Sequence, residues 1–189
     1  MKSPPTPVPQ PDAFPEVTGQ PASTTTSAGD TESQSLYTLI AEQPFFKGLN
    51  PQQLQLLTDS AMEMRFDAEQ EILQEGSPAN RFYLILEGKV VLESALSERD
   101  MIPIQTLGPG DDLGWSWLFP PYLLNSSARA LDPTRTIFFY GTRLREQCEQ
   151  DPALGFQLMQ RVAGVVIQRL QVTQQRLTEC VRTSKLPGG

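Results

Sequence analysis

The spacing of hydrophobic residues along the chain changes twice, near residue 64 and near residue 141. Between these positions, short apolar runs alternate with Gly, Pro, Asn or Asp, a pattern typical of strands joined by turns. On either side, apolar residues recur every three or four positions, which is the spacing of an amphipathic helix. The chain is therefore predicted to be α+β and mainly β: a small antiparallel β-barrel or jelly roll, flanked by N-terminal helices and a long C-terminal helix.

Six segments are predicted to supply the strands: MRFDA, EILQEG, RFYLILEGKVVLES, IPIQTLGPGD, SARALD and RTIFFYG. The third is interpreted as a hairpin that turns at Glu87-Gly88, with the apolar run Phe82–Ile85 as a core strand. Ahead of the strands, helices are expected over 36–43 and over 51–62. The second of these begins at Asn50-Pro51, an N-cap followed by proline in the first helical position.

The last predicted helix follows a shorter one over 142–150 and extends from Asp151-Pro152 to about Arg182. Roughly thirty residues at about 1.5 Å each give a rod of about 45 Å, too long for one face of a domain of this size. The first half is predicted to pack on the barrel and the second half to pair with another copy, so a homodimer is expected. Apolar positions of the dimer helix are spaced alternately four and three residues apart, as in a coiled-coil seam: Met159, Ala163, Val166, Leu170, Thr173, Leu177 and Cys180.

Composition divides the chain into four parts. Residues 1–34 are rich in Pro, Ser and Thr and poor in large apolar side chains, which predicts a disordered tail. Two roles stay open for this tail, a solvating segment or a recognition segment for an unidentified partner protein. The barrel with its flanking helices is expected over 35–150, the long helix over 151–183 and a flexible end over 184–189.

Charge and residue types exclude several classes of function. The net charge of -7 disfavours DNA and anionic membrane surfaces as partners, because both require clustered Lys and Arg. No apolar run reaches the ~18 residues of a membrane span, and no signal peptide is recognised, so a cytoplasmic protein is expected. The absence of histidine removes His-centred catalysis and most zinc or iron sites, so no enzyme, metal or cofactor is expected. Cys148 and Cys180 are expected to be reduced thiols.

The segment ILQEGSPANRFYLILEGKV resembles the first signature of the cyclic-nucleotide-binding domain, as in the catabolite activator family. Gly76 and Gly88 take the turn positions, and Ala79 takes the small-residue position. The resemblance covers about residues 36–182 and implies a regulatory ligand-binding domain. The chain is similar to a stand-alone, divergent member without the helix-turn-helix DNA-binding domain. The resemblance therefore implies that any output passes to a separate protein.

The segment GDDLGWSWLFPPYLLNSSARAL resembles the phosphate-binding cassette of that family, with both charged contacts replaced. In the family, a Glu accepts from the ribose hydroxyl, and an Arg about ten residues later holds the cyclic phosphate. Gly114 matches the start of the cassette, Trp115 takes the Glu position and Leu124 takes the Arg position. Losing two charged hydrogen bonds costs about 3–6 kcal/mol, so cAMP and cGMP are possible but disfavoured ligands. The expected pocket residues are Gly114, Trp115, Ser116, Trp117, Leu124, Asn125, Ser126 and Arg129.

Arg129 is the one cation near the cassette that could replace the missing arginine. In an extended strand, residues 124, 126 and 128 share one face and residue 129 lies on the other, so Arg129 is predicted to point away from a pocket that Leu124 faces. A bulge could reverse this orientation.

The aromatic and proline residues of the cassette leave three interpretations open: extra core, the wall of an apolar ligand pocket, or an exposed patch for a partner protein. They are Trp115, Trp117, Phe119, Pro120, Pro121 and Tyr122. The sequence thus predicts a dimeric, non-enzymatic regulatory module whose pocket is modified for another ligand or for none. The alternative is a structural or interaction protein, with an inert barrel and a recruiting N-terminal tail.

Overall fold

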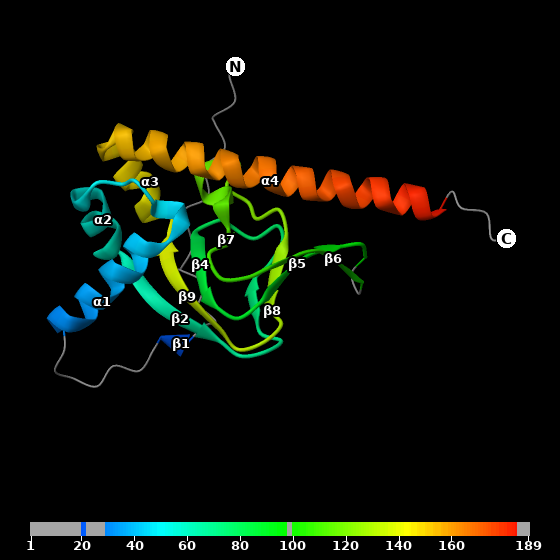
Figure 1. The fold of residues 1–189 in the computed structure, drawn as a ribbon, viewed down its shortest axis with the longest axis horizontal. Coiled ribbons are helices and arrows are strands. Elements are labelled where there is room, and N and C mark those ends of the chain that lie inside the picture. Colours follow the sequence, from blue (N-terminus) through cyan, green and yellow to red (C-terminus); the bar gives the residue numbers. More distant parts are fainter. Residues whose placement is uncertain (1–19, 22–28, 98–99, 185–189) are drawn as a thin grey trace, which may run out of the picture.

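The computed structural model describes residues 20–21, 29–97 and 100–184 of the chain. Within these ranges the strands form two antiparallel sheets, which pack against each other through a shared apolar core. The long helix α4 (Pro152–Ser184) crosses the top of the sheets in the view of Figure 1 and extends beyond them.

The larger sheet has the strand order β1-β2-β9-β4-β7, and the smaller sheet has the order β3-β8-β5-β6. The strands of the larger sheet are β1 (Gln20–Pro21), β2 (Ala61–Phe66), β4 (Arg81–Glu87), β7 (Asp112–Leu113) and β9 (Thr134–Tyr140). Those of the smaller sheet are β3 (Glu71–Leu73), β5 (Val90–Ala95), β6 (Met101–Leu107) and β8 (Ser127–Ala130). The predicted antiparallel, mainly β fold is confirmed, but the two sheets do not close into a barrel.

The predicted hairpin at Glu87-Gly88 is wrong, because β4 and β5 belong to different sheets. The strand β4 pairs with β7 and β9, whereas β5 pairs with β6 and β8. The turn carries the chain from one sheet to the other, and Gly88 adopts a φ of 92° there. A Cβ atom at this position would lie 2.5 Å from Oγ1 of Thr134, so the turn requires glycine.

The run Phe82–Ile85 is apolar at every position because β4 is buried on both faces. Phe82 and Leu84 point into a core between the larger sheet and the helices. Tyr83 and Ile85 point into the second core, between the two sheets. A strand in this position has no polar face, which explains why the sequence shows no alternation there.

The helices cover one face of the larger sheet (Figure 1). They are α1 (Gly29–Glu42), α2 (Pro51–Thr58), α3 (Gly141–Gln150) and α4, with a 3-10 turn η1 at Pro44–Phe46. The N-cap predicted at Asn50 is present as a full capping box: Asn50 Oδ1 accepts from the backbone N–H of Gln53, and Oε1 of Gln53 accepts from that of Asn50. The helix ends at Thr58 and not at residue 62, because Ala61–Phe66 pairs as β2 with β9.

The predicted tail 1–34 begins its ordered structure earlier than expected. Residues 20–21 pair with β2, and the first helix starts at Gly29, six residues before the predicted boundary at 35. The remainder of the tail lies outside the described residues, as does the predicted flexible end 184–189 apart from Ser184, which is the last residue of α4.

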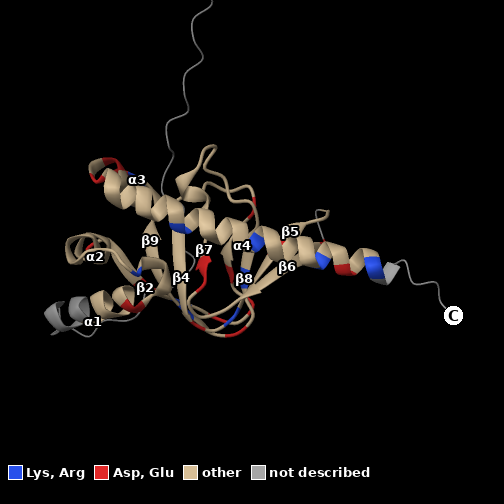
Figure 2. Ribbon diagram, turned by 45° about the horizontal axis from the view of Figure 1, so that its top comes forward, with Lys and Arg blue, Asp and Glu red and all other residues tan. Residues whose placement is uncertain are grey.

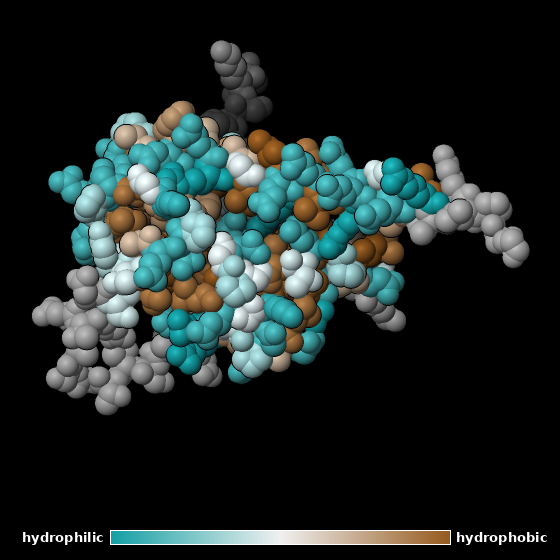
Figure 3. Space-filling model, in the orientation of Figure 1, coloured by the Kyte–Doolittle hydropathy of each residue, from teal (hydrophilic) through white to brown (hydrophobic). Residues whose placement is uncertain are grey.

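The first half of α4 packs into the helix-side core through Leu154, Leu158 and Val162, as predicted. Asp151 begins this helix: its Oδ1 accepts from the backbone N–H of Leu154, and its Oδ2 accepts from Gln53 of α2. The side-chain hydrogen bond from Gln53 lowers the pKa of Asp151. The seam positions Ala163, Leu170, Thr173 and Leu177 are exposed, while Val166 is half-buried. Figure 3 shows hydrophobic residues at the surface along α4.

Candidate functional site

The cassette begins at Gly114, whose φ is 80°. A Cβ atom there would clash with the carbonyl oxygen of Arg81, so only glycine fits this turn between β7 and the next element. The next element is a 3-10 turn, η2 (Trp115–Leu118). It places Trp115 and Ser116 around a cavity that Leu73 and Leu92 of the smaller sheet also line.

A small cavity lies between the cassette, the smaller sheet and α4, with a volume of about 20 Å³. This volume holds about one water molecule, whereas ligand pockets usually measure about 300–1,000 Å³. The residues around it are Leu73, Leu92, Gly114, Trp115, Ser116, Leu124, Asn125, Ser126 and Arg169. Six of the eight predicted pocket residues therefore surround one cavity, and Trp117 and Arg129 do not.

Leu124, in the position of the family's phosphate-binding arginine, is a core residue. Its side chain is only 7% exposed and packs between the two sheets. Its backbone is fixed by the turn at Gly76: the Gly76 N–H donates to Leu124 O, and the Leu124 N–H donates to Ser77 O, both at 2.9 Å. The Gly76 turn thus holds the cassette strand, and the apolar side chain of Leu124 closes one wall of the cavity.

Arg129 lies on the opposite face of β8 and points away from the cavity. Its Nη2 donates to Glu93 Oε1 at 2.6 Å and its Nε to Glu93 Oε2 at 3.2 Å. Nη1 donates to a carboxylate oxygen of Glu69. This position agrees with strand parity, and both carboxylates already engage the guanidinium, so Arg129 does not replace the missing phosphate contact.

The aromatic cluster of the cassette divides between three environments. Trp117 is completely buried in the helix-side core, edge-on to Phe82, and its Nε1 has no hydrogen-bond partner within the described ranges. Trp115 is half-buried and lines the cavity. Phe119 and Tyr122 are 38% and 40% exposed, and the guanidinium of Arg145 lies 4.5 Å from the Tyr122 ring centroid. Extra core therefore describes Trp117, whereas the pocket-wall interpretation of Trp115 and the partner-patch interpretation of Phe119 and Tyr122 stay predictions.

Arg169 is the one cationic side chain among the described residues around the cavity, and sequence reasoning missed it. Its Nη2 donates to the backbone oxygen of Asp112 in β7 and lies 3.6 Å from Asp112 Oδ2. Both side chains are largely buried, with exposed fractions of 18% for Arg169 and 5% for Asp112. Burial raises the pKa of Asp112, and the positive charge of Arg169 partly opposes that rise.

The sequence does contain a pattern that indicates a buried position for Arg169. The pattern is a stripe along α4 in which each residue comes directly before a residue of the predicted seam. This stripe continues the buried face at alternating steps of four and three: Leu158, Val162, Val165, Arg169, Val172 and Arg176. Its members are apolar in the first half of the helix and include two arginines in the second. A stripe of this kind predicts that the second half of α4 rests on polar atoms of the sheets.

Two further arginines of α4 contact backbone carbonyl oxygens of other elements. Nη2 of Arg161 donates to Lys47 O at 2.8 Å, and Nη1 of Arg176 donates to the oxygen of Ile104 in β6. Figure 2 shows basic residues at intervals along α4 where it crosses the strands. Guanidinium–carbonyl hydrogen bonds thus hold α4 at three separate points.

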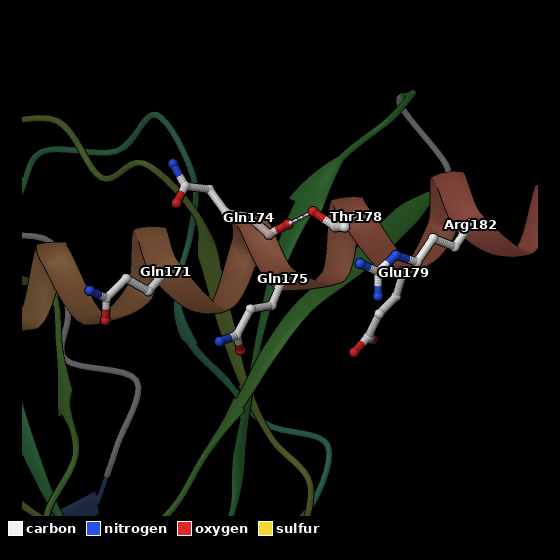
Figure 4. A pocket seen from close by; sticks show the side chains of 6 residues that line it. All are labelled: Gln171, Gln174, Gln175, Thr178, Glu179 and Arg182. Atoms are coloured by element: carbon white, nitrogen blue, oxygen red, sulfur yellow. Dashed lines mark hydrogen bonds between the residues drawn. The ribbon is translucent and has the colours of Figure 1, made fainter.

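A second depression lies over the C-terminal half of α4 (Figure 4). Its lining comes from this one helix: Gln171, Gln174, Gln175, Thr178, Glu179 and Arg182. Because no second element faces these side chains among the described residues, the depression is an open polar surface of the helix and not a ligand pocket.

The parts of the chain that the structure describes contain neither a metal site nor a membrane-spanning helix. Those residues contain no group of three or more His, Cys, Asp and Glu side chains placed to hold a metal ion. In the same ranges, no helix combines the length and the apolar character needed to span a bilayer.

Comparison with known proteins gives consistent matches. The family profile of the cyclic nucleotide-binding domain matches residues 63–151. A solved structure from Geobacter metallireducens GS-15, named as a cyclic nucleotide-binding protein, is 35% identical, with a TM-score of 0.63 over 73% of this chain and 97% of that one.

Two regulators extend the comparison. A CRP-like cAMP-activated global transcriptional regulator of Mycobacterium tuberculosis is 26% identical over 150 residues, which make up 79% of this chain and only 65% of that protein. The chain therefore spans less than two thirds of that regulator. The regulatory subunit of a cAMP-independent protein kinase A from Trypanosoma brucei shares the fold, with a TM-score of 0.64 at 19% identity, over 77% of this chain and 50% of that one.

Proposed function

Because the chain belongs to the cyclic nucleotide-binding domain family, we propose that it is a non-enzymatic regulatory module whose cassette pocket serves a ligand other than cAMP or cGMP. The observation that carries this proposal is the position of Leu124, which takes the place of the phosphate-binding arginine and is 7% exposed in the core. Trp115, in the place of the ribose-binding glutamate, supplies no acceptor for a sugar hydroxyl.

Two further features support the exclusion of a cyclic nucleotide. Arg129 could have reached the cassette if a bulge had reversed its orientation, but its guanidinium forms ion pairs with Glu69 and Glu93. The cavity of about 20 Å³ holds about one water molecule, so a nucleotide would need a much larger widening of the pocket than a small ligand would. A site that lacks two charged hydrogen bonds would bind about 100- to 10,000-fold more weakly than an intact one.

Relatives of the same fold are named both as cAMP-activated and as cAMP-independent proteins. The fold therefore does not by itself require cAMP as the effector. Regulation in this chain would pass through α4, because this helix both lines the cavity with Arg169 and presents an exposed surface to a partner.

The partner of α4 in this proposal is a second copy of the chain. Leu170 and Leu177 of the seam are 53% and 65% exposed, and the seam repeats at steps of three and four residues. Apolar residues at this spacing form one face of a helix, and a second helix that packs on this face removes them from water. The other predicted role, recruitment through the N-terminal tail, depends mostly on residues outside the described ranges and stays a prediction.

A thermal-shift titration with cAMP and cGMP up to millimolar concentration tests the proposed function. An intact micromolar site at a hundredfold excess of ligand would add about 2.7 kcal/mol, which raises Tm by about 5–11 °C. We expect a change of less than about 1 °C in the native chain on the same scale. The matched variant carries Trp115→Glu and Leu124→Arg together and is expected to gain a cAMP response. A shift of several degrees in the native chain would refute the proposal.

A further inference from the structure

The cavity at the cassette combines one arginine with leucine and tryptophan side chains, and this combination specifies a ligand class. Building on the proposed ligand-binding function, we infer that the pocket takes a small carboxylate with an apolar body. The carboxylate binds the guanidinium of Arg169 on α4, and the body packs against Leu73, Leu92 and Trp115.

Arg169 has donors left for such a ligand. Its contacts with other described residues use Nη2 alone, which donates to Asp112 O. The guanidinium carries five N–H groups in a planar fork, and this fork matches a carboxylate through two parallel hydrogen bonds. Nε and Nη1 are therefore available to an anion. The side chain is 18% exposed, so an anion beside it is only partly screened by water.

The other residues around the cavity favour a hydrocarbon body over a sugar. Leu73, Leu92 and Leu124 provide aliphatic surface, and Trp115 provides one aromatic face. The polar contributions are the two hydroxyl groups of Ser116 and Ser126 and the amide of Asn125. No Asp or Glu is among the lining residues of the described chain, so the hydroxyls of a ribose would meet no carboxylate. An apolar pocket with a few converging polar groups is the usual form of a small-molecule site.

The cavity must widen to admit the ligand, because about 20 Å³ holds one water molecule. The wall best able to move is the second half of α4. Hydrogen bonds from Arg169 and Arg176 to carbonyl oxygens hold this half against the sheets. Water can replace such contacts at small cost, whereas the leucines of the sheets lie in the core between them. A carboxylate on Arg169 keeps the helix joined to the cassette while the apolar body fills the widened space.

The test is a titration of the full chain with benzoate and hexanoate, followed by the Tm and by the tryptophan emission in a Trp117→Phe background, where Trp115 in the cavity wall is the one emitter. Benzamide and hexanamide are the uncharged counterparts, and inorganic phosphate and cAMP are the polar anions. We expect saturable responses to the carboxylates, at least about tenfold weaker responses to the amides, and none to phosphate or cAMP.

Two arginine variants separate the role of Arg169 from a general loss of charge. Arg169→Gln is expected to weaken carboxylate binding at least about tenfold. Arg176→Gln is the matched control, because Arg176 also donates to a sheet carbonyl but does not line the cavity. It is expected to bind within about threefold of the native chain. If Arg169→Gln fails to fold, Arg169→Lys keeps the charge, loses the two-pronged geometry and should still bind more weakly.

Each contrary result has a separate meaning. Carboxylate binding that survives Arg169→Gln would overturn the role of Arg169, and amide binding as strong as carboxylate binding would overturn the charged ligand class. Absence of any carboxylate response would overturn the inference as a whole. Failure of the proposed function would look different, because it would appear as a large Tm shift with cAMP.

Discussion

The two halves of α4 are attached to the rest of the molecule by different forces. In the first half, Leu154, Leu158 and Val162 are at most 1% exposed and belong to the core under the larger sheet. In the second half, Arg169 and Arg176 donate hydrogen bonds to backbone oxygens of β7 and β6. One continuous helix therefore has an apolar anchor at one end and polar contacts at the other.

The difference in force predicts a difference in mobility. Burial of an aliphatic side chain stabilises by about 1.5–3 kcal/mol, and water offers no substitute for the lost contacts. A guanidinium–carbonyl hydrogen bond exchanges with water, so its net contribution is smaller when the site is partly exposed. The second half of α4 can thus separate from the sheets while the first half stays in the core, and the boundary falls near Arg169.

Among substitutions in α4, the largest loss in the free energy of unfolding is expected in its apolar first half. Leu158→Ala removes a side chain that is 1% exposed and should lower the free energy of unfolding by about 2–5 kcal/mol. Leu177→Ala, at a position of the second half that is 65% exposed, should change it by less than about 0.5 kcal/mol when the protein is dilute enough to be monomeric. Urea unfolding at low protein concentration measures both. Equal losses in the two variants would remove the distinction between the halves.

The next effect is expected at Arg169 and depends on pH. Arg169→Gln removes the cation that offsets the burial of Asp112, so the pKa of Asp112 rises further above its ordinary value of 3.8. A carboxyl group whose folded-state pKa is raised stabilises the fold most below its unfolded pKa, and this stability is lost as pH rises through the folded pKa. The variant should therefore be about 1–3 kcal/mol less stable than the native chain at pH 7, with a smaller difference near pH 4.

Unfolding curves at several pH values measure this difference, and a second substitution identifies its source. Asp112→Asn combined with Arg169→Gln removes the carboxyl group and should remove most of the pH dependence. If the cost of Arg169→Gln stays constant between pH 4 and pH 7, the Asp112 carboxylate is not its source.

The same two halves show which parts of the fold the sequence could predict. Helical and strand periodicity is a local property, so it indicated the order of helices and strands and the packing of the first half of α4. The boundary near residue 64 was less exact, because α2 ends at Thr58 and β2 begins at Ala61. Strand pairing is not local: the tight turn at Gly88 suggested a hairpin, although β4 and β5 lie in different sheets. The apolar run Phe82–Ile85 held the necessary information, because a strand without a polar face must have covering layers on both sides.

At the site, the resemblance to a known cassette located Gly114, Trp115 and Leu124, and strand parity placed Arg129 on the outer face. Neither could locate Arg169, because its contact with Asp112 joins residues 57 positions apart. The predicted seam also assigned this part of α4 to a dimer interface through Leu170 and Leu177, which lie on the face next to Arg169. Arg169 could instead be found from its place in the buried stripe of α4, because a charged residue on a buried helix face needs a polar partner. The residues next to it in the sequence give no such indication.

A smaller effect is expected at Arg176. Its contact with Ile104 is exposed, so Arg176→Gln should change the free energy of unfolding by less than about 1 kcal/mol. Amide hydrogen exchange in the last part of α4 should nevertheless become faster, because local opening no longer breaks this contact. Arg182→Gln removes the same charge near the helix end and should leave exchange around residue 176 unchanged. Equal acceleration in both variants would show that charge, not the contact with β6, protects the helix.

The smallest effect on the fold, and a complete effect on assembly, is expected at the exposed seam of the second half. Leu177→Glu places a charge in the proposed dimer interface, at a position that is 65% exposed within one copy. Sedimentation velocity should show a dimer for the native chain and a monomer for the variant, because two carboxylates would face each other in the seam. Gln175→Glu adds the same charge on the polar face in Figure 4 and should remain dimeric. A native chain that sediments as a monomer at high concentration would mean that this seam serves a different partner or none.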